Sequence, residues 1–355
     1  MSNPVEKPLA GSLSILSAGA CTPAGLTLNA NVASFRAGLN NFARSAYFRD
    51  QRSGANFTLS CLDSIRDTTA AQRMRFSALK AAGEACGSLA VASHLNAGLL
   101  LAAPEDRPGF SSQLARELAQ AIVAQVPLSI SKQHCVIQQG GNAGLMLLLR
   151  TAHQLLSARD LDVCLLGGAD SYIQIEALHW LENSGRLRSP EQPNGLIPGE
   201  GAAFLVLSRT DSVSRCGGKA IGELSGFSTT QEPQPWYRRQ ATLGRGLTDT
   251  VRQTFQTATA SEADAVYADM NGESWRADEW GYAYLRNASH IASPLRTFHL
   301  ASSLGETGAA SAPLALSIAA AVPKHSQNGG KSLLVWSASG TLPLRGSCLL
   351  RKVEA

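Results

Sequence analysis

The sequence is poor in charge and lacks several signals that would place it in a functional class. Only 16% of its 355 residues are Asp, Glu, Lys or Arg, and no long run of one sign occurs, so nucleic-acid binding is not predicted. No stretch reaches the ~18 apolar residues of a membrane span. Residues 1–12 lack the apolar core of a signal peptide. We therefore expect a cytoplasmic protein that does not associate with membranes.

The cysteines and histidines do not form a recognisable ligand or disulfide pattern. There are seven cysteines, an odd number, and no two are spaced as a C-x-x-C pair. Cys135 and Cys164 lie in apolar runs and are predicted to be buried and unbridged. The seven histidines show no metal-ligand spacing. The sequence therefore predicts neither a metal site nor a cofactor.

Strand-like and helix-like segments alternate along the chain. This alternation is typical of a layered α/β fold, and two similar halves are predicted, at residues 11–210 and 218–353. A turn-rich loop is expected at 47–60. Strands are predicted at 12–18, 98–103, 131–137, 161–166, 202–207, 219–227, 265–269, 332–337 and 346–353, and helices at 29–39, 71–85, 113–126, 143–156, 247–258 and 311–322.

A glycine-rich corner, residues 138–144, links one of these strands to a strongly apolar helix. Many α/β enzymes hold a nucleophile at such a corner, because the helix N-terminus lowers the pKa of a thiol there. This corner reads Gln-Gln-Gly-Gly-Asn-Ala-Gly and offers no Cys, Ser or Thr. It also lacks the Lys-Ser/Thr pair of a phosphate-binding loop. The position is suited to catalysis, but the usual nucleophiles are missing.

Several segments, in this order, resemble the β-ketoacyl synthase branch of the thiolase-like superfamily. The resemblance extends over about 13–353 and implies a duplicated, layered α-β-α-β-α fold with two mixed sheets. The matching segments are the opening strand with its turn at 22–25, the helix at 75–82, the strand and Gly-Gly turn at 162–171, the GEGA strand at 199–207, the Asn-Gly-Glu turn at 271–273, the Gly-Glu-Thr-Gly-Ala-Ala segment at 305–310 and the closing loop at 339–341.

The resemblance also locates the positions that carry the family's chemistry. Condensing members use a Cys at the corner and two His residues that assist decarboxylation of a malonyl-thioester. Those three positions hold Gly141, Asn271 and Glu306, and a family Lys position holds Ala301. Sliding the corner by one or two residues selects Asn142 or Gln139, and neither is a thiol. The resemblance therefore implies that the whole Cys-His-His set is replaced.

Two interpretations of the replacements remain open at this stage. Gly141 and Asn271 could serve tight turns, with Glu306 in a salt bridge or facing solvent. Alternatively, Asn142, Asn271 and Glu306 could form a repurposed polar binding pocket. Further candidates for binding are Gln139 in the corner, and His299 and Ser303 shortly before Glu306.

Two functions follow from the resemblance. The preferred one is a catalytically inactive, synthase-like pseudo-enzyme that acts as scaffold, adaptor or partner subunit. It would form a homodimer, or a heterodimer with a related synthase, through strand pairing across a two-fold axis, and an acyl carrier protein or a protein cargo would be its partner. The alternative is an enzyme that processes acyl-thioesters as a decarboxylase, acyltransferase or hydrolase. Some relatives with Gln in place of the Cys are linked to decarboxylation, and a buried Glu306 could act as a general base.

Overall fold

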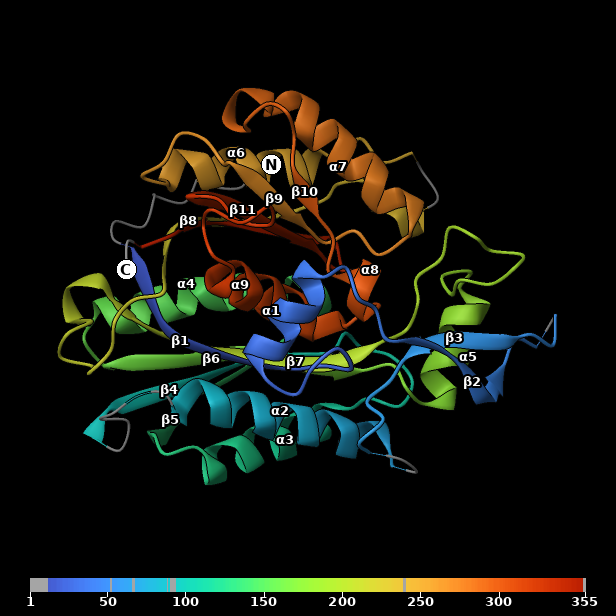
Figure 1. Cartoon of the computed structure of the whole chain (residues 1–355), viewed down its shortest axis with the longest axis horizontal. Coiled ribbons are helices and arrows are strands. Elements are labelled where there is room, and N and C mark those ends of the chain that lie inside the picture. The colour runs from blue at the N-terminus through green and yellow to red at the C-terminus, as the bar shows by residue number, and fades with distance from the viewer. Residues whose placement is uncertain are drawn as a thin grey trace.

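Five layers of helices and strands make up the protein. The structure is a computed structural model that describes residues 12–353 except 52, 66–67, 88, 90–93 and 239–240. In Figure 1, helices α6 and α7 lie above one group of strands, α4 and α9 lie in the middle, and α2 and α3 lie below a second group of strands. This confirms the predicted duplicated α-β-α-β-α fold.

The first half of the described chain contributes one set of strands and the helices that cover it. Its elements are β1 (Leu13–Cys21), α1 (Leu28–Arg36), β2 (Phe42–Arg49), β3 (Asn56–Ser60), α2 (Ala70–Gly87), β4 (Asn96–Ala103), α3 (Ser112–Gln125), β5 (Ser129–Gln139), α4 (Gly144–Ser157), β6 (Val163–Ser171), α5 (Ile175–Asn183) and β7 (Glu200–Arg209).

The second half repeats the alternation of strands and helices. Its elements are β8 (Gly222–Gln231), α6 (Arg245–Thr257), β9 (Ala265–Ala268), α7 (Ser274–Arg286), β10 (Thr297–Phe298), α8 (Ala301–Leu304), α9 (Ser311–Ala321), β11 (Ser332–Ala338) and β12 (Leu344–Arg351).

The two halves have the same strand topology. In the first, β5, β4 and β6 are parallel neighbours, and β7 and β1 add antiparallel strands. In the second, β10, β9 and β11 are parallel, and β12 and β8 are antiparallel. The two sheets expected from the sequence are joined where Leu13–Ile15 of β1 pair with Gly222–Leu224 of β8, so the hydrogen bonds form a single ten-stranded sheet in the described chain. The boundaries at 210 and 218 stay a prediction, and residue 11 lies outside the described residues.

Apolar side chains fill the spaces between the five layers in three main clusters. The first surrounds the middle helices and holds Leu145 and Leu149 of α4 and Leu314 of α9. The second lies between the strands of the first half and helices α2 and α3, and the third lies between the strands of the second half and helices α6 and α7. Strand β6 is buried along its whole length, and coverage on both faces explains why it begins with a continuous apolar run at residues 163–166.

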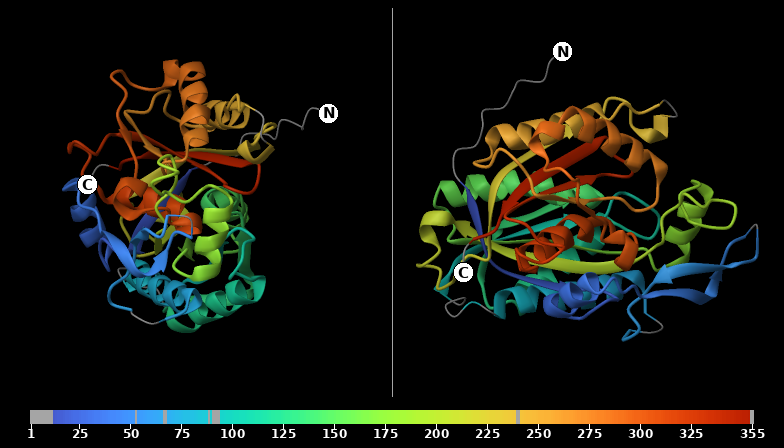
Figure 2. Two further views of the ribbon diagram at one scale, coloured as in Figure 1. Left: turned by 90° about the vertical axis from the view of Figure 1, so that its right-hand side faces the viewer. Right: turned by 45° about the horizontal axis from the view of Figure 1, so that its top comes forward.

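A hairpin projects from one end of the molecule, where the sequence indicates a loop at 47–60. Strands β2 and β3 pair with each other and lie beside α5 (Figure 2). Alternate residues of β3, Phe57 and Leu59, are buried in a separate apolar cluster with Leu178 and Leu181 of α5. The prediction of a loop holds for residues 50–51 and 53–55, between the strands, and was wrong for the strands themselves, because β3 has only five residues and its alternation is too short to stand out.

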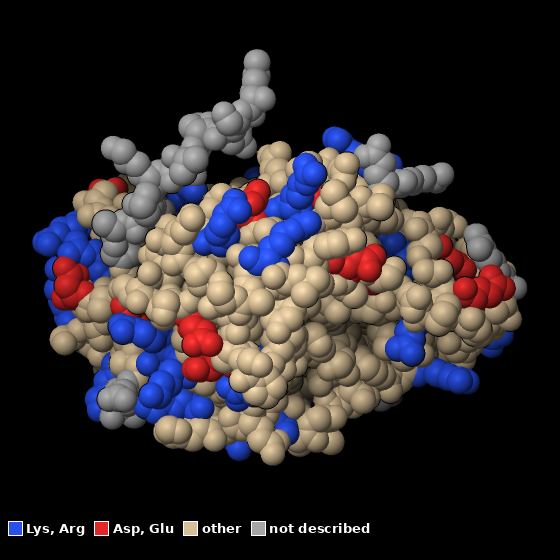
Figure 3. Space-filling view, turned by 90° about the horizontal axis from the view of Figure 1, so that it is seen from above, with Lys and Arg blue, Asp and Glu red and all other residues tan. Residues whose placement is uncertain are grey.

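Three sequence expectations concern the whole molecule. No helix within the described ranges is long and apolar enough to cross a membrane. All seven cysteines are free, although Cys135 is only half-buried while Cys164 is buried as predicted. On the face shown in Figure 3, basic and acidic side chains are interspersed among uncharged ones, without a continuous stripe of one sign.

Candidate functional site

The glycine-rich corner has the backbone geometry that the sequence indicated. Strand β5 ends at Gln139, a single 3₁₀ turn spans Gly141–Ala143, and α4 begins at Gly144. Gly141 has φ = +52°, in the left-handed region that residues with a Cβ disfavour. Gly141 and Asn142 are buried. The corner is thus a tight, closed turn.

The space beside Gly141 is taken by Glu105, a residue that sequence analysis did not select. A Cβ placed on Gly141 would lie 2.4 Å from Cγ and 2.6 Å from Oε1 of Glu105. The same Oε1 accepts hydrogen bonds from Ser339 Oγ at 2.5 Å and from the backbone N–H of Gly340 at 2.6 Å. Glu105 lies two residues after the end of β4, and that end pairs with the end of β5. A carboxylate so close to the corner was the signal in the sequence that could have identified it.

Glu306 is the centre of a buried hydrogen-bond network. Its Oε1 accepts from the side-chain amide of Asn142 at 3.0 Å and from the N–H of Gly308 at 2.6 Å, and Ser311 Oγ lies 3.4 Å away. Its Oε2 accepts from Asn271 at 2.5 Å. The structure therefore brings Asn142, Asn271 and Glu306 together, as the second interpretation required, but their polar groups are directed at one another.

Asn271 connects Glu306 to a second buried carboxylate, Glu273. The amide of Asn271 donates to Glu273 Oε2 at 3.0 Å, and the N–H of Glu273 donates back to Asn271 Oδ1 at 3.1 Å. Arg186 then binds both oxygens of Glu273, at 2.7 and 3.0 Å. Burial alone would raise the pKa of Glu273, but Arg186 outweighs it and the pKa falls to about 2.

Asp269 and Arg276 complete the network. Asp269 receives hydrogen bonds from Asn142 at 3.0 Å and from the N–H of Ala338 at 3.0 Å, and Arg276 Nη1 pairs with it at 2.6 Å. Burial raises the pKa of Asp269 to about 6, with a further rise from Glu306, although Arg276 opposes both effects. Arg276 also lies 3.9 Å from Glu306 Oε2. Buried carboxylates in this arrangement are held by paired guanidinium groups, as burial of charge requires.

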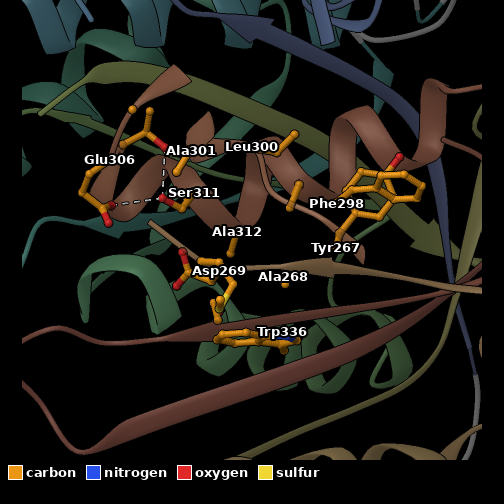
Figure 4. A pocket seen from close by; sticks show the side chains of 15 residues that line it. Tyr267, Ala268, Asp269, Phe298, Leu300, Ala301, Glu306, Ser311, Ala312 and Trp336 are labelled. Atoms are coloured by element: carbon orange, nitrogen blue, oxygen red, sulfur yellow. Dashed lines mark hydrogen bonds between the residues drawn. The ribbon is translucent and has the colours of Figure 1, made fainter. Parts of the chain in front are cut away.

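A small cavity borders this network. It is lined by Asp269, Glu306 and Ser311 at its polar end and by Tyr267 and Phe298 at its apolar end (Figure 4). Its volume is about 20 Å³, enough for one or two water molecules. An acyl chain therefore does not fit into it in this conformation.

Two large side chains, Met146 and Trp275, are buried outside the lining of this cavity. Met146 of α4 is buried, and its Cβ and Cγ lie 2.5 Å from where a Cβ on Gly346 would be. Trp275 of α7 is buried and stacks on Trp236, with ring centroids 6.2 Å apart. The close packing of Met146 against the backbone of β12 explains why glycine is needed at position 346.

Within the described chain, the remaining predicted residues form no hydrogen bond to the network, although Ala301 lines the same cavity as Glu306 (Figure 4). Gln139 is exposed at the end of β5. His299 is half-buried, and burial lowers the pKa of its imidazole. Ser303 and the neighbouring Ala301 belong to the short helix α8, where Ser303 is buried. The described residues contain no group of three or more His, Cys, Asp or Glu side chains placed to hold a metal ion.

Comparison with known proteins agrees with the fold. No protein-family model matches the sequence, and no curated protein matches it either. The ketosynthase from module 6 of the bacillaene synthase of Bacillus subtilis 168 superposes with a TM-score of 0.78 at 13% identity, covering 97% of this chain and 72% of that one.

Two further structures are covered over their whole length. The ishigamide ketosynthase/chain length factor gives a TM-score of 0.79 at 16% identity, over 97% of this chain and 100% of that one. A β-ketoacyl synthase from Burkholderia phymatum STM815 gives 0.71 at 15% identity, with 97% and 100% coverage. The chain therefore has the thiolase-like fold of ketosynthases.

Proposed function

We propose that this protein is a catalytically inactive, ketosynthase-like subunit that acts through its surfaces as a partner or scaffold. The observation that carries the proposal is the closed hydrogen-bond network that joins two of the matching positions, Asn271 and Glu306, to Asn142, the residue after the third matching position, Gly141. Glu306 accepts from both Asn142 and Asn271, and Arg276 lies beside it. A thiol and an imidazole are the groups that this family's condensation chemistry requires, and neither is found in this network.

The nature of the partner is inferred from the similar structures. One of them is a ketosynthase/chain length factor, and another is described as a type II polyketide acyl-carrier protein in complex with its ketosynthase, which gives a TM-score of 0.74 at 14% identity over 98% of this chain. By analogy we infer pairing with a related synthase, or with a second copy of this chain, and docking of an acyl carrier protein. Strand β5, which is at the edge of the described sheet, is the proposed pairing element.

Turnover is the direct test of inactivity. The purified protein is incubated with malonyl- and acyl-thioesters of pantetheine, and release of CO₂ and of free thiol is followed beside an active ketosynthase. We expect both rates to equal those of buffer alone. Release that disappears in Glu306→Gln or Asn271→Ala would instead establish the alternative, an enzyme with altered acyl-thioester chemistry.

Assembly is the test of the scaffold role. The molar mass of the protein, 37.4 kDa per chain, is measured by light scattering alone and after co-expression with a ketosynthase and its carrier protein. We expect a dimer with itself or with the synthase, and a product profile that depends on its presence and survives Glu306→Gln at a temperature where that variant is folded. A monomer that leaves the synthase's products unchanged would contradict the proposal.

A further inference from the structure

The carboxylate of Glu105 stands where the side chain of residue 141 would be. At 2.4 Å from Cγ and 2.6 Å from Oε1, a Cβ on Gly141 would be closer to Glu105 than non-bonded carbon atoms approach in proteins. Glu105 follows β4, whereas Gly141 follows β5, and these two strands are parallel neighbours. The overlap therefore arises from the sheet itself.

Glu105 is fixed in this place by the other half of the fold. Ser339 Oγ and the N–H of Gly340, both in the loop after β11, donate to its Oε1, and the residue is only 3% exposed. Hydrogen bonds to a carboxylate are about twice as strong as neutral ones. Rotating the side chain away would leave the N–H of Gly340 without this acceptor in a buried site.

The same bonds occupy a donor that a ligand could otherwise use. A backbone N–H at the end of a strand, aimed into a corner, is the kind of group that binds a carbonyl oxygen of an acyl group. Here the N–H of Gly340 is already bonded to Glu105. The Glu105 side chain thus both fills the space beside Gly141 and occupies the N–H of Gly340.

We propose that Glu105 is an internal plug, which excludes both a side chain at position 141 and the carbonyl oxygen of an acyl group from the corner. The inference rests on the proposed function in that it names the residue that keeps the inactive site closed. If Glu105 fills this space, the effect on stability of a substitution at Gly141 depends on which residue is at position 105.

A double-mutant cycle on thermal stability tests the pair. Gly38→Ala is the matched control, because Gly38 has φ = +66° and a Cβ added there would have nothing within 4 Å. We expect Gly38→Ala to lower Tm by about 1–3 °C through backbone strain alone, and Gly141→Ala to lower it clearly further. Combined with Glu105→Ala, the loss should be smaller than the sum of the two single losses. Additive losses, or equal effects of the two glycine substitutions, would overturn the plug.

A chemical readout tests access to the corner. Gly141→Cys is prepared with Glu105, with Glu105→Ala and with Glu105→Gln, and alkylation by iodoacetamide is followed at the residue-141 peptide by mass spectrometry. We expect labelling about tenfold faster or more with Glu105→Ala, the factor that ~1.4 kcal/mol of opening cost produces, and slow labelling with the equally large Gln. Equal rates would refute the plug. Thioester turnover by the unaltered protein would instead refute the proposed function, so the two failures are distinguishable.

Discussion

The side-chain amide of Asn142 donates a hydrogen bond of 3.0 Å to Oε1 of Glu306, 164 residues further along the chain. This bond joins the helix-start corner of the first half of the fold to the corresponding segment of the second half. Asn142, Asn271 and Glu306 do form one polar cluster, and in it Glu306 is partnered by amides and by Arg276.

Removing the charge of Glu306 should destabilise the protein strongly. In Glu306→Gln, one oxygen is replaced by an NH₂ group, which would face either Asn142 or Asn271 as a second donor, and Arg276 loses a neighbouring charge. Breaking a buried charge network of this kind costs about 3 kcal/mol, measurable by urea unfolding. Glu262→Gln, at an exposed carboxylate, is the control and should change stability by less than about 0.5 kcal/mol. Equal effects of the two substitutions would contradict the network.

Asp269 should make stability fall as pH rises. Burial raises its pKa from 3.8 to about 6, so between these values the folded state binds more protons than the unfolded state. This favourable contribution is fully present below pH 3.8 and is lost as pH rises through about 6. Relative to wild type, Asp269→Asn should therefore gain up to roughly 3 kcal/mol between pH 4 and 7, measured by urea unfolding at several pH values. A difference between the proteins that does not change with pH would show that Asp269 titrates normally.

Glu273 should have the opposite effect, making the free energy of unfolding rise as pH rises. Its pKa is lowered from 4.5 to about 2 because Arg186 outweighs the effect of burial, so its contribution is present above pH 4.5 and is lost as pH falls towards 2. Glu273→Gln should accordingly be most destabilising near neutral pH and much less so near pH 2.5. Unfolding of both proteins over pH 2.5–7 gives the comparison, and a constant penalty over that range would refute the assignment.

Asn142→Asp should place a third carboxylate between two others. The substitution conserves shape but replaces the amide donor that now satisfies Asp269 and Glu306. Like charges in a buried site disfavour ionisation, so we expect a loss of about 3 kcal/mol at pH 8 and a smaller loss at pH 5, where one group takes up a proton. Asn40→Asp, at an exposed position, is the control. Thermal melts at both pH values suffice, and a loss independent of pH would argue against charge repulsion.

Met146→Ala should create a cavity in the middle layer. Met146 is 1% exposed and packs against Gly346 of β12, so truncation should cost about 2–5 kcal/mol. Leu285→Ala, at a side chain that is 73% exposed, should cost far less. Denaturant unfolding of the two variants compares them. A small loss for Met146→Ala would mean that the layers can close over the vacated space.

Much of the fold could be predicted because its signals are local. Strands β4 and β6 are marked by apolar runs of consecutive residues. Helix α3 is marked by Ser111 at its start, whose Oγ accepts a hydrogen bond from the N–H of Leu114. The β2–β3 hairpin, α5 and α7 were missed. The strands are short, and the buried side of α7 includes the charged Arg276 and Glu279, so it does not form an apolar stripe in the sequence. The order of the glycine motifs did predict the layered architecture.

The sequence by itself determined that the corner offers no Cys, Ser or Thr, and its resemblance to β-ketoacyl synthases predicts that Gly141, Asn271 and Glu306 replace the family's Cys and two His. Only the tertiary structure decided what these residues contact. Glu105 reaches Gly340 across 235 positions, and Arg186 reaches Glu273 across 87. Such pairings depend on strands from both halves ending side by side, and no local periodicity encodes that placement. The tertiary structure therefore determines that the corner is filled by a glutamate and surrounded by partnered charges.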